Sequence, residues 1–203
     1  MSQTDVNSPD FWEGAYQNLD APWDLSGPTP VFAALLESGR FKPGRLIVLG
    51  AGRGHDARLF ARAGFDVTAV DFAAQAVADM RALAEADAPV DVQQADIFAL
   101  PAALSGQFDY VLEYTCFCAI DPQRHAEYAD AVAGLLRPGG TYIALAFPIE
   151  ARTSGPPFGV SPDELESLFT TRGLALLERG PSPHTIKPRR GREELMIFVK
   201  GET

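Results

Sequence analysis

The chain has 203 residues, 46% of them hydrophobic and 22% charged, a composition typical of one globular domain. Folding at this size buries roughly 70% of the unfolded surface, so no disulfide or metal is needed for stability. The formal net charge of -10 argues against binding to nucleic-acid phosphates. No apolar stretch approaches the ~20 residues of a membrane span. The first ten residues lack a signal-peptide pattern, and we expect a cytoplasmic protein.

The two cysteines, Cys116 and Cys118, form a C-F-C triplet with no second Cys or His group at the spacing of zinc ligands. We therefore expect two reduced thiols that pack as small hydrophobic side chains, and no metal site.

The N-terminal segment predicts two helices. Residues 8–17 begin with a capping serine and a proline, and residues 29–39 begin with Thr-Pro and end at a glycine. Residues 21–30 between them are too rich in Pro and Gly for regular structure. We expect residues 1–40 to form a helical lid on an α/β core of residues 41–203, within a single domain.

The rest of the chain alternates strands and helices. The predicted strands are 45–49, 65–70, 90–94, 108–112 and 141–147, and the predicted helices are 55–62, 73–86 and 122–136. This alternation predicts a mostly parallel sheet with helices on both faces. A capping box begins a further helix at 161–169. Residues 174–178 and 194–200 are expected to pair as a terminal antiparallel hairpin.

A glycine-rich turn follows the first strand. Gly50, Gly52 and Gly54 alternate there, which brings bare backbone close to a ligand and leads into a helix N-terminus. The spacing differs from the G-x-G-x-x-G of dinucleotide sites, and no Gly-Lys-Ser/Thr follows. A nicotinamide dehydrogenase is therefore disfavoured. The alternative is an ordinary tight turn without a ligand.

Two acidic residues follow the next two strands. Asp71 lies at the end of the second strand, where a carboxylate can accept hydrogen bonds from two ribose hydroxyls. Asp96 and Ile97 follow the third strand and are suited to the exocyclic amine and the face of a purine. As alternatives, Asp71 is a solvated strand end or a helix cap, and Asp96 is a turn residue.

Several motifs resemble those of known enzymes. GAGRGHDA, AVDF, QADIF and LRPGG, in that order, resemble a class I S-adenosylmethionine-dependent methyltransferase. FWEGAYQ…APWDLSGPTP, DYVLEYTCFCAIDP and GPPFGVSPDELESLF…PHTIKPRRGREEL resemble the thiopurine/thiol methyltransferase family, and most closely its thiol and halide branch. The resemblance extends from Phe11 to Val199, and its N-terminal and GPPF motifs are the most selective.

The resemblance implies a Rossmann-like fold with seven strands, mostly parallel with the last one antiparallel. It implies S-adenosylmethionine as cofactor, S-adenosylhomocysteine as product, a small-molecule acceptor, and neither nucleic acid nor membrane as partner; we favour a monomer. The implied cofactor contacts are Trp12, Tyr16, Trp23, Gly50, Ala51, Gly52, Asp71, Phe72, Asp96, Ile97, Glu113 and Tyr114. The implied acceptor pocket contains Phe147, Phe158, His184, Arg189 and Arg190. Two positions vary within the family: the thiopurine branch has Arg at position 114, and much of the thiol and halide branch has Trp at position 16.

The residues of the lid can also be interpreted without the resemblance. The polar N-terminal segment of residues 1–39, called the leader below, contains a concentration of aromatic rings: Phe11, Trp12, Tyr16 and Trp23. Aromatic faces attract a cation such as a sulfonium by roughly 0.5–2 kcal/mol when desolvated. The alternative is that these rings only attach the leader to the domain. In the same way, Arg189 and Arg190 either attract an anionic acceptor or are solvated loop charges.

Methyl transfer from a sulfonium is an in-line displacement, in which positioning and water exclusion carry most of the acceleration. A thiol with a pKa of about 8.5 is already partly ionised at neutral pH, and a halide needs no base. We therefore assign no catalytic base. The predicted activity is methylation of a thiol, a thiopurine-like sulfur, hydrosulfide or halide. The alternatives are O- or N-methylation of a small metabolite, or a non-catalytic cofactor-binding module.

Overall fold

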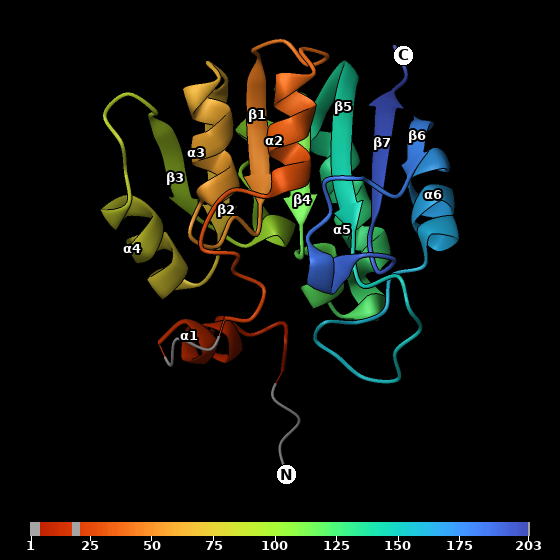
Figure 1. The fold of residues 1–203 in the computed structure, drawn as a ribbon, viewed down its shortest axis with the longest axis horizontal. Helices are drawn as coiled ribbons and strands as arrows, with labels where there is room; N and C mark the ends of the chain where they lie inside the picture. Colours follow the sequence, from red (N-terminus) through yellow and green to blue (C-terminus); the bar gives the residue numbers. More distant parts are fainter. Residues whose placement is uncertain (1–4, 18–20, 203) are drawn as a thin grey trace.

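The computed structural model describes residues 5–17 and 21–202, so residues 1–4, 18–20 and 203 of the predicted domain lie outside the described residues. The strands are β1 (Arg45–Leu49), β2 (Asp66–Asp71), β3 (Val90–Gln94), β4 (Phe108–Tyr114), β5 (Leu136–Ala146), β6 (Leu174–Gly180) and β7 (Glu194–Lys200). They form one sheet in the order β3-β2-β1-β4-β5-β7-β6 (Figure 1). Strands β1 to β5 pair in parallel, and β7 is antiparallel to β5 and β6. The predicted mostly parallel sheet is confirmed.

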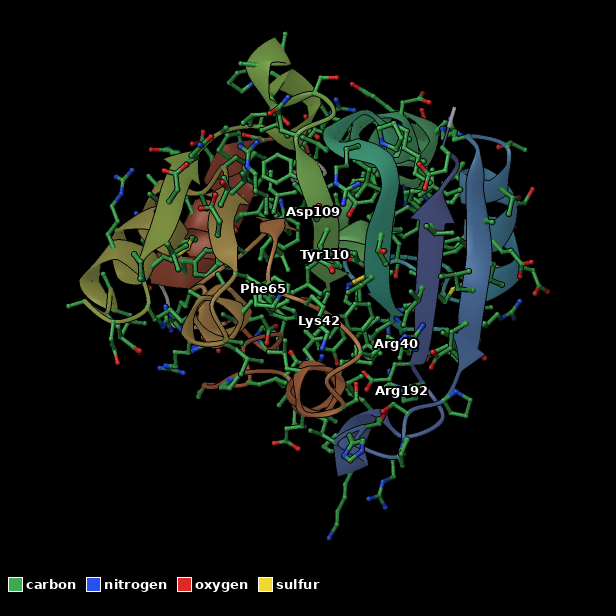
Figure 2. All side chains as sticks on the ribbon, turned by 90° about the horizontal axis from the view of Figure 1, so that it is seen from above. Arg40, Lys42, Phe65, Asp109, Tyr110 and Arg192 are labelled. Atoms are coloured by element: carbon green, nitrogen blue, oxygen red, sulfur yellow. The ribbon has the colours of Figure 1, made fainter. Side chains whose placement is uncertain are left out.

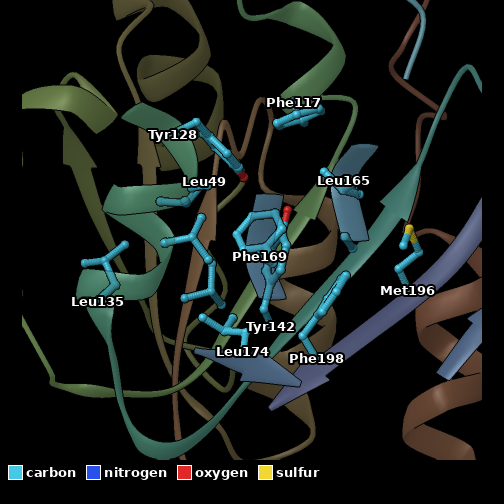
Figure 3. Packing of buried hydrophobic residues seen from close by; sticks show 14 of the residues in the cluster. Leu49, Phe117, Tyr128, Leu135, Tyr142, Leu165, Phe169, Leu174, Met196 and Phe198 are labelled. Carbon is cyan, nitrogen blue, oxygen red and sulfur yellow. The ribbon is translucent and has the colours of Figure 1, made fainter. Parts of the chain in front are cut away.

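Helices cover both faces of this sheet (Figure 2). They are α1 (Pro9–Gln17), α2 (Pro30–Glu37), α3 (His55–Arg62), α4 (Ala74–Ala82), α5 (His125–Leu135) and α6 (Pro162–Thr170). Because side chains alternate along a strand, Leu46 and Val48 of β1 pack with α2 and α3, whereas Ile47 and Leu49 pack with α5 and α6. Figure 3 shows the core on the α5 and α6 side, which contains Leu49. A continuous apolar run is thus what a strand buried on both faces requires.

The amino ends of the central strands are closed by local contacts. The Asp109 carboxylate accepts the Arg45 backbone N–H at 2.7 Å, and the Tyr110 hydroxyl donates to the Lys42 carbonyl at 3.1 Å. The rings of Phe65 and Tyr110 pack edge to face, with centroids 5.5 Å apart (Figure 2). A ligand is therefore expected at the opposite edge, where the parallel strands end.

Several predicted boundaries are wrong, for local reasons. Strand β5 begins at Leu136, not Thr141, because Leu136 pairs with Phe108 across a register shift. Helix α4 ends at Ala82, short of residue 86, and the chain turns back through a bridge between Glu85 and Ala88. Residues 122–124 form a 3-10 turn before α5, and the Asp121 carboxylate caps that turn.

The leader divides into two parts. Helix α2 buries Val31 and Phe32 in the core, so it does not belong to a lid as the boundary at residue 40 had implied. Helix α1 instead lies beyond the carboxyl ends of the strands, next to α4 (Figure 1). Within residues 5–17 and 21–202, no helix is long and apolar enough to span a membrane.

Candidate cofactor and acceptor site

A cavity of about 570 Å³ lies at the carboxyl ends of the central strands. The leader, the loop after β5 and the 3-10 turn η5 (Lys187–Arg189) border it, and all three meet at this edge of the sheet (Figure 1). A smaller hollow of about 70 Å³ adjoins it along the glycine turn. The loops that the sequence associates with a ligand therefore surround one space.

The glycine turn presents bare backbone to this space. Gly50 has φ +60° and Gly52 has φ +54°, the left-handed region that favours glycine. A Cβ on Gly50 would lie 2.7 Å from Cys116 Sγ, and a Cβ on Gly52 would lie 3.1 Å from the Tyr16 hydroxyl oxygen. Gly50 borders both cavities, whereas Ala51 and Gly52 border the smaller one. Side chains at the two glycines would close the approach to the main chain.

Asp71 closes β2 beside that turn and lines the large cavity. One carboxylate oxygen accepts the Gly52 backbone N–H at 2.9 Å, and the other accepts the Ala73 N–H at 3.0 Å. Burial raises the pKa of Asp71, and these N–H donors counteract part of that shift. Each carboxylate oxygen has a second lone pair, so the group can still accept two hydroxyls.

Apolar side chains border the next part of the cavity. Phe72, Ile97 and Phe98 line it together with Asp96. Asp96 also accepts the Phe98 backbone N–H at 2.9 Å. It therefore stabilises the local turn, which was the alternative role considered for it, and it lines the cavity as well. The Arg124 guanidinium lies over the Phe98 ring, 3.5 Å from its centroid. This end is suited to a planar heterocycle with an exocyclic amine.

The leader rings form a connected group above the cavity. Trp23 packs edge to face on Trp12 and Tyr16, with centroid distances of 5.5 and 5.6 Å. The indole N–H of Trp23 donates to the Tyr16 hydroxyl at 3.3 Å, and that of Trp12 donates to the Val6 carbonyl at 2.9 Å. All three rings line the cavity, and they also pack against the start of α4. They therefore attach the leader and cover the cavity at the same time.

Arg189 is a buried cation at the other end, with only 6% of its surface exposed. Its guanidinium lies over the rings of Tyr114 and Phe147, at 4.8 and 4.7 Å from their centroids. One terminal nitrogen, Nη2, donates to the Trp23 carbonyl at 3.2 Å. The other, Nη1, is buried with no hydrogen-bond partner within the described part of the chain. Arg192 also lines the cavity and pairs with Glu150.

Glu113 and Tyr114 are consecutive in β4 and point to opposite faces. Tyr114 borders the smaller cavity and donates to the Glu193 carboxylate. Glu113 borders neither cavity, contrary to the prediction that it contacts the cofactor. It is buried beneath the floor, where its carboxylate accepts the Phe117 N–H at 3.0 Å and fixes the loop after β4.

Three predicted acceptor residues do not border the cavity. His184 is exposed and borders a separate hollow with Val31 and Arg179. Arg190 is exposed because the η5 turn directs Arg189 inward and its neighbour outward. Phe158 packs over Gly155, and its backbone N–H donates to the Cys118 carbonyl at 2.7 Å.

Other lining residues were missed by sequence reasoning. They are chiefly Cys116, Cys118, Arg124, Pro188 and Arg192. The spacing of Arg189 and Arg192 is a signal that could have been used, because one turn of helix-like chain places them on one side. The two thiols were expected only as packing groups, and they are free.

Glu113 predicts a pH-dependent stability. Burial raises its pKa to about 7, so the folded chain binds a proton that the unfolded chain loses near pH 4.5. The free energy of unfolding should therefore fall between pH 4.5 and 7 and then level off, with Glu113 accounting for about 3 kcal/mol. Glu113→Gln keeps the acceptor for Phe117. In urea unfolding, the free energy of unfolding of Glu113→Gln minus that of wild type should be larger at pH 8 than at pH 5. The same difference at both pH values would contradict this prediction.

The sheet order, the glycine turn after β1 and the acid that closes β2 define a class I methyltransferase fold that binds S-adenosylmethionine. A family model described as thiopurine S-methyltransferase matches residues 7–192. The chain belongs to the thiopurine S-methyltransferase family.

Known proteins agree with this assignment. The chain is 34% identical over 201 residues to a probable thiol methyltransferase 2 of Arabidopsis thaliana, covering 97% of this chain and 88% of that protein. It is 29% identical over 193 residues to thiocyanate methyltransferase 1 of the same plant, covering 93% and 84%.

Solved structures share the fold. One, from work on the conversion of a disulfide bond into a thioacetal group during echinomycin biosynthesis, has a TM-score of 0.79 at 21% identity, over 96% of this chain and 94% of that one. The 1,6-didemethyltoxoflavin-N1-methyltransferase of Burkholderia thailandensis, with bound S-adenosylhomocysteine, has a TM-score of 0.72 at 21% identity, over 95% and 87%. The expected family, fold class and cofactor are confirmed.

Proposed function

We propose that the protein transfers the methyl group of S-adenosylmethionine to a small, singly charged soft anion, namely hydrosulfide, thiocyanate or a small thiolate. A halide ion of the same charge is the nearest alternative acceptor. The observation that carries this proposal is the buried Arg189 guanidinium, whose Nη1 has no hydrogen-bond partner among the described residues. A buried donor of this kind requires an acceptor, and a charged guanidinium is best satisfied by an anion.

The ionisable groups around the cavity argue in the same direction. None of the described residues that line it is a histidine. Burial raises the pKa of the Cys116 and Cys118 thiols, so both remain protonated and neither serves as a base at neutral pH. A neutral hydroxyl or amine acceptor would need a proton acceptor beside it, and the carboxylates that line the cavity, Asp71 and Asp96, lie at the end that we assign to the ribose and purine. An anionic acceptor needs no proton acceptor.

The cofactor, when bound, supplies an electrophilic methyl group on a sulfonium. We assign its ribose to the buried Asp71 carboxylate and its purine to the end bordered by Asp96 and Ile97. The backbone of residues 50–52 would lie against its amino-acid portion. Trp12, Tyr16 and Trp23 would cover the sulfonium, excluding water and attracting its positive charge.

Replacement of Arg189 tests the acceptor. Arg189→Met keeps an apolar chain between the two rings and removes the charged donors. Because a hydrogen bond to a charged group contributes about 1.5–3 kcal/mol, kcat/KM for hydrosulfide and thiocyanate should fall by about 10- to 100-fold. The measurement is mass detection of methanethiol and methyl thiocyanate at saturating S-adenosylmethionine. Arg189→Lys should recover part of the loss.

Arg190→Met is the matched comparison, because Arg190 is the exposed neighbour outside the cavity. Its kcat/KM should stay within about twofold of wild type, as for most surface substitutions. Undiminished turnover of both anions by Arg189→Met would refute the assigned role. Turnover of phenols or amines with no product from any thiol, thiocyanate or halide would favour the O- or N-methylation alternative.

A further inference from the structure

Arg53 lies within the glycine turn and joins two parts of the molecule that are far apart in sequence. Its Nη1 is 2.6 Å from the Asp24 carboxylate of the leader, and its Nε is 2.9 Å from the Asp79 carboxylate of α4. The three side chains are largely shielded from water, with 22%, 9% and 25% exposed for Arg53, Asp24 and Asp79 respectively. Ion pairs with this degree of burial are screened less than surface pairs.

On the leader side, the Arg53–Asp24 ion pair adjoins the aromatic rings that cover the cavity. Asp24 directly follows Trp23, and its second oxygen accepts the Ser26 backbone N–H at 2.7 Å. The Arg53 guanidinium is 5.9 Å from the centroid of the Tyr16 ring, whose hydroxyl accepts the Trp23 indole N–H. Arg53 therefore fixes the position of both aromatic side chains without lining the large cavity itself.

On the core side, Asp79 is held by the Gln75 side-chain amide at 2.7 Å. The Gln75 backbone N–H in turn donates to Glu13 of α1 at 2.9 Å. Besides the packing of its rings on the start of α4, the described part of the leader is thus tied to α4 by polar contacts, directly through Glu13 and indirectly through Arg53.

The charge of the leader makes this attachment dependent on a core cation. Residues 1–39 contain six acidic side chains and no lysine or arginine, since the first basic residue of the sequence is Arg40. The leader carries no cation that could neutralise Asp79. Without Arg53, the Asp24 carboxylate would keep as a potential cation only the His55 imidazole, 3.3 Å away and with its pKa lowered by burial, and Asp79 would keep no cationic partner among the described residues. A partly buried ion pair that loses one partner is strongly destabilised.

We propose that Arg53 is a positioning residue that holds the leader closed over bound S-adenosylmethionine by bridging Asp24 and Asp79. It acts through Tyr16 and Trp23 and touches neither acceptor nor methyl group. The inference depends on the cofactor site and not on the acceptor proposed above. Binding of S-adenosylhomocysteine without any acceptor therefore tests it separately.

The test compares Arg53→Met and Arg53→Lys with wild type. Arg53→Met should weaken S-adenosylhomocysteine binding at least tenfold by calorimetry. It should raise KM for S-adenosylmethionine by a similar factor, with kcat at saturating cofactor within threefold of wild type. Arg53→Lys should recover part of the affinity, because a lysine can pair with either carboxylate although it lacks the planar fork.

Two further readouts report on the leader directly. Trp12 and Trp23 are the only tryptophans in the chain, so their emission monitors the leader alone. The leader contains no trypsin site but several chymotrypsin sites, and Arg53→Met should speed chymotrypsin cleavage at Trp23 at least fivefold. Adding Asp79→Asn to Arg53→Met should slow that cleavage again, because it removes the carboxylate charge that Arg53 had neutralised.

Arg62→Met is the matched control, since Arg62 of α3 also pairs with a carboxylate, that of Glu85, but away from the leader. It should leave affinity, emission and cleavage unchanged. A folded Arg53→Met protein with wild-type affinity and wild-type cleavage would overturn the proposal. A fall in kcat at saturating cofactor with unchanged KM would also overturn it, because Arg53 would then act in the reaction step.

Discussion

Asp71→Ala is expected to weaken the binding of S-adenosylmethionine and S-adenosylhomocysteine by about 100-fold or more. Two hydrogen bonds from ribose hydroxyls to a charged, buried acceptor contribute about 1.5–3 kcal/mol each, and each 1.4 kcal/mol is tenfold in affinity. The substitution also removes the acceptor of the Gly52 N–H, which shapes the turn under the cofactor. Isothermal titration with either nucleoside measures the loss.

Asp66→Ala is the control for this change, because Asp66 begins the same strand and its side chain is 81% exposed. It should bind both nucleosides as wild type does. Circular dichroism and thermal unfolding establish that Asp71→Ala is folded. A folded Asp71→Ala protein with undiminished affinity would show that the ribose is held elsewhere.

Gly50→Ala should lower the free energy of unfolding by about 2–5 kcal/mol. An L residue in the left-handed region costs about 1–2 kcal/mol, and forcing a methyl group into a packed site costs about 1–3 kcal/mol more. The added Cβ would lie 2.7 Å from Cys116 Sγ and 2.9 Å from Cys116 Cβ, so the loop after β4 would have to move. Urea unfolding measures the change, and cofactor affinity should fall with it.

Cys116→Gly in the Gly50→Ala background separates the two causes. It removes both contacting atoms, so it should recover the part of the loss that comes from the contact and leave the backbone strain. Gly27→Ala is the control, since no atom of the described residues lies within 4 Å of the position that its methyl group would take and its φ is not in the left-handed region. An equal loss for Gly27→Ala and Gly50→Ala would contradict this account.

Much of the sheet could be predicted because a strand that is buried on both faces has a run of apolar residues in its sequence. The run of apolar residues in β1 is required by helices on both sides, and the glycines and Asp71 follow from where parallel strands end. Boundaries set by pairing partners, such as the early start of β5 opposite Phe108, depend on another strand and have no local signal.

The acceptor end could be predicted only in outline. The neighbouring arginines Arg189 and Arg190 are visible in the sequence, but which of the two guanidinium groups turns inward depends on the three-residue η5 turn. Arg189 is buried, whereas Arg190 is exposed. His184 was assigned to the pocket from its place in a matching loop, yet that loop passes over α2 before it reaches the cavity. Glu113 and Tyr114 show the same limit. Because side chains alternate along β4, Tyr114 borders the smaller cavity, whereas its neighbour Glu113 is buried on the other face of the strand.

Cys116 lines the space that we assign to the methyl donor. Its thiol is therefore a potential target for methylation by the protein's own cofactor. Only a thiolate is an effective nucleophile, and burial raises the pKa of this thiol so that it stays protonated far above neutral pH. Burial in the apolar wall that we assign to a soft acceptor therefore keeps the Cys116 sulfur inert. On this assignment, ionisation state is what distinguishes an acceptor sulfur from the protein's own.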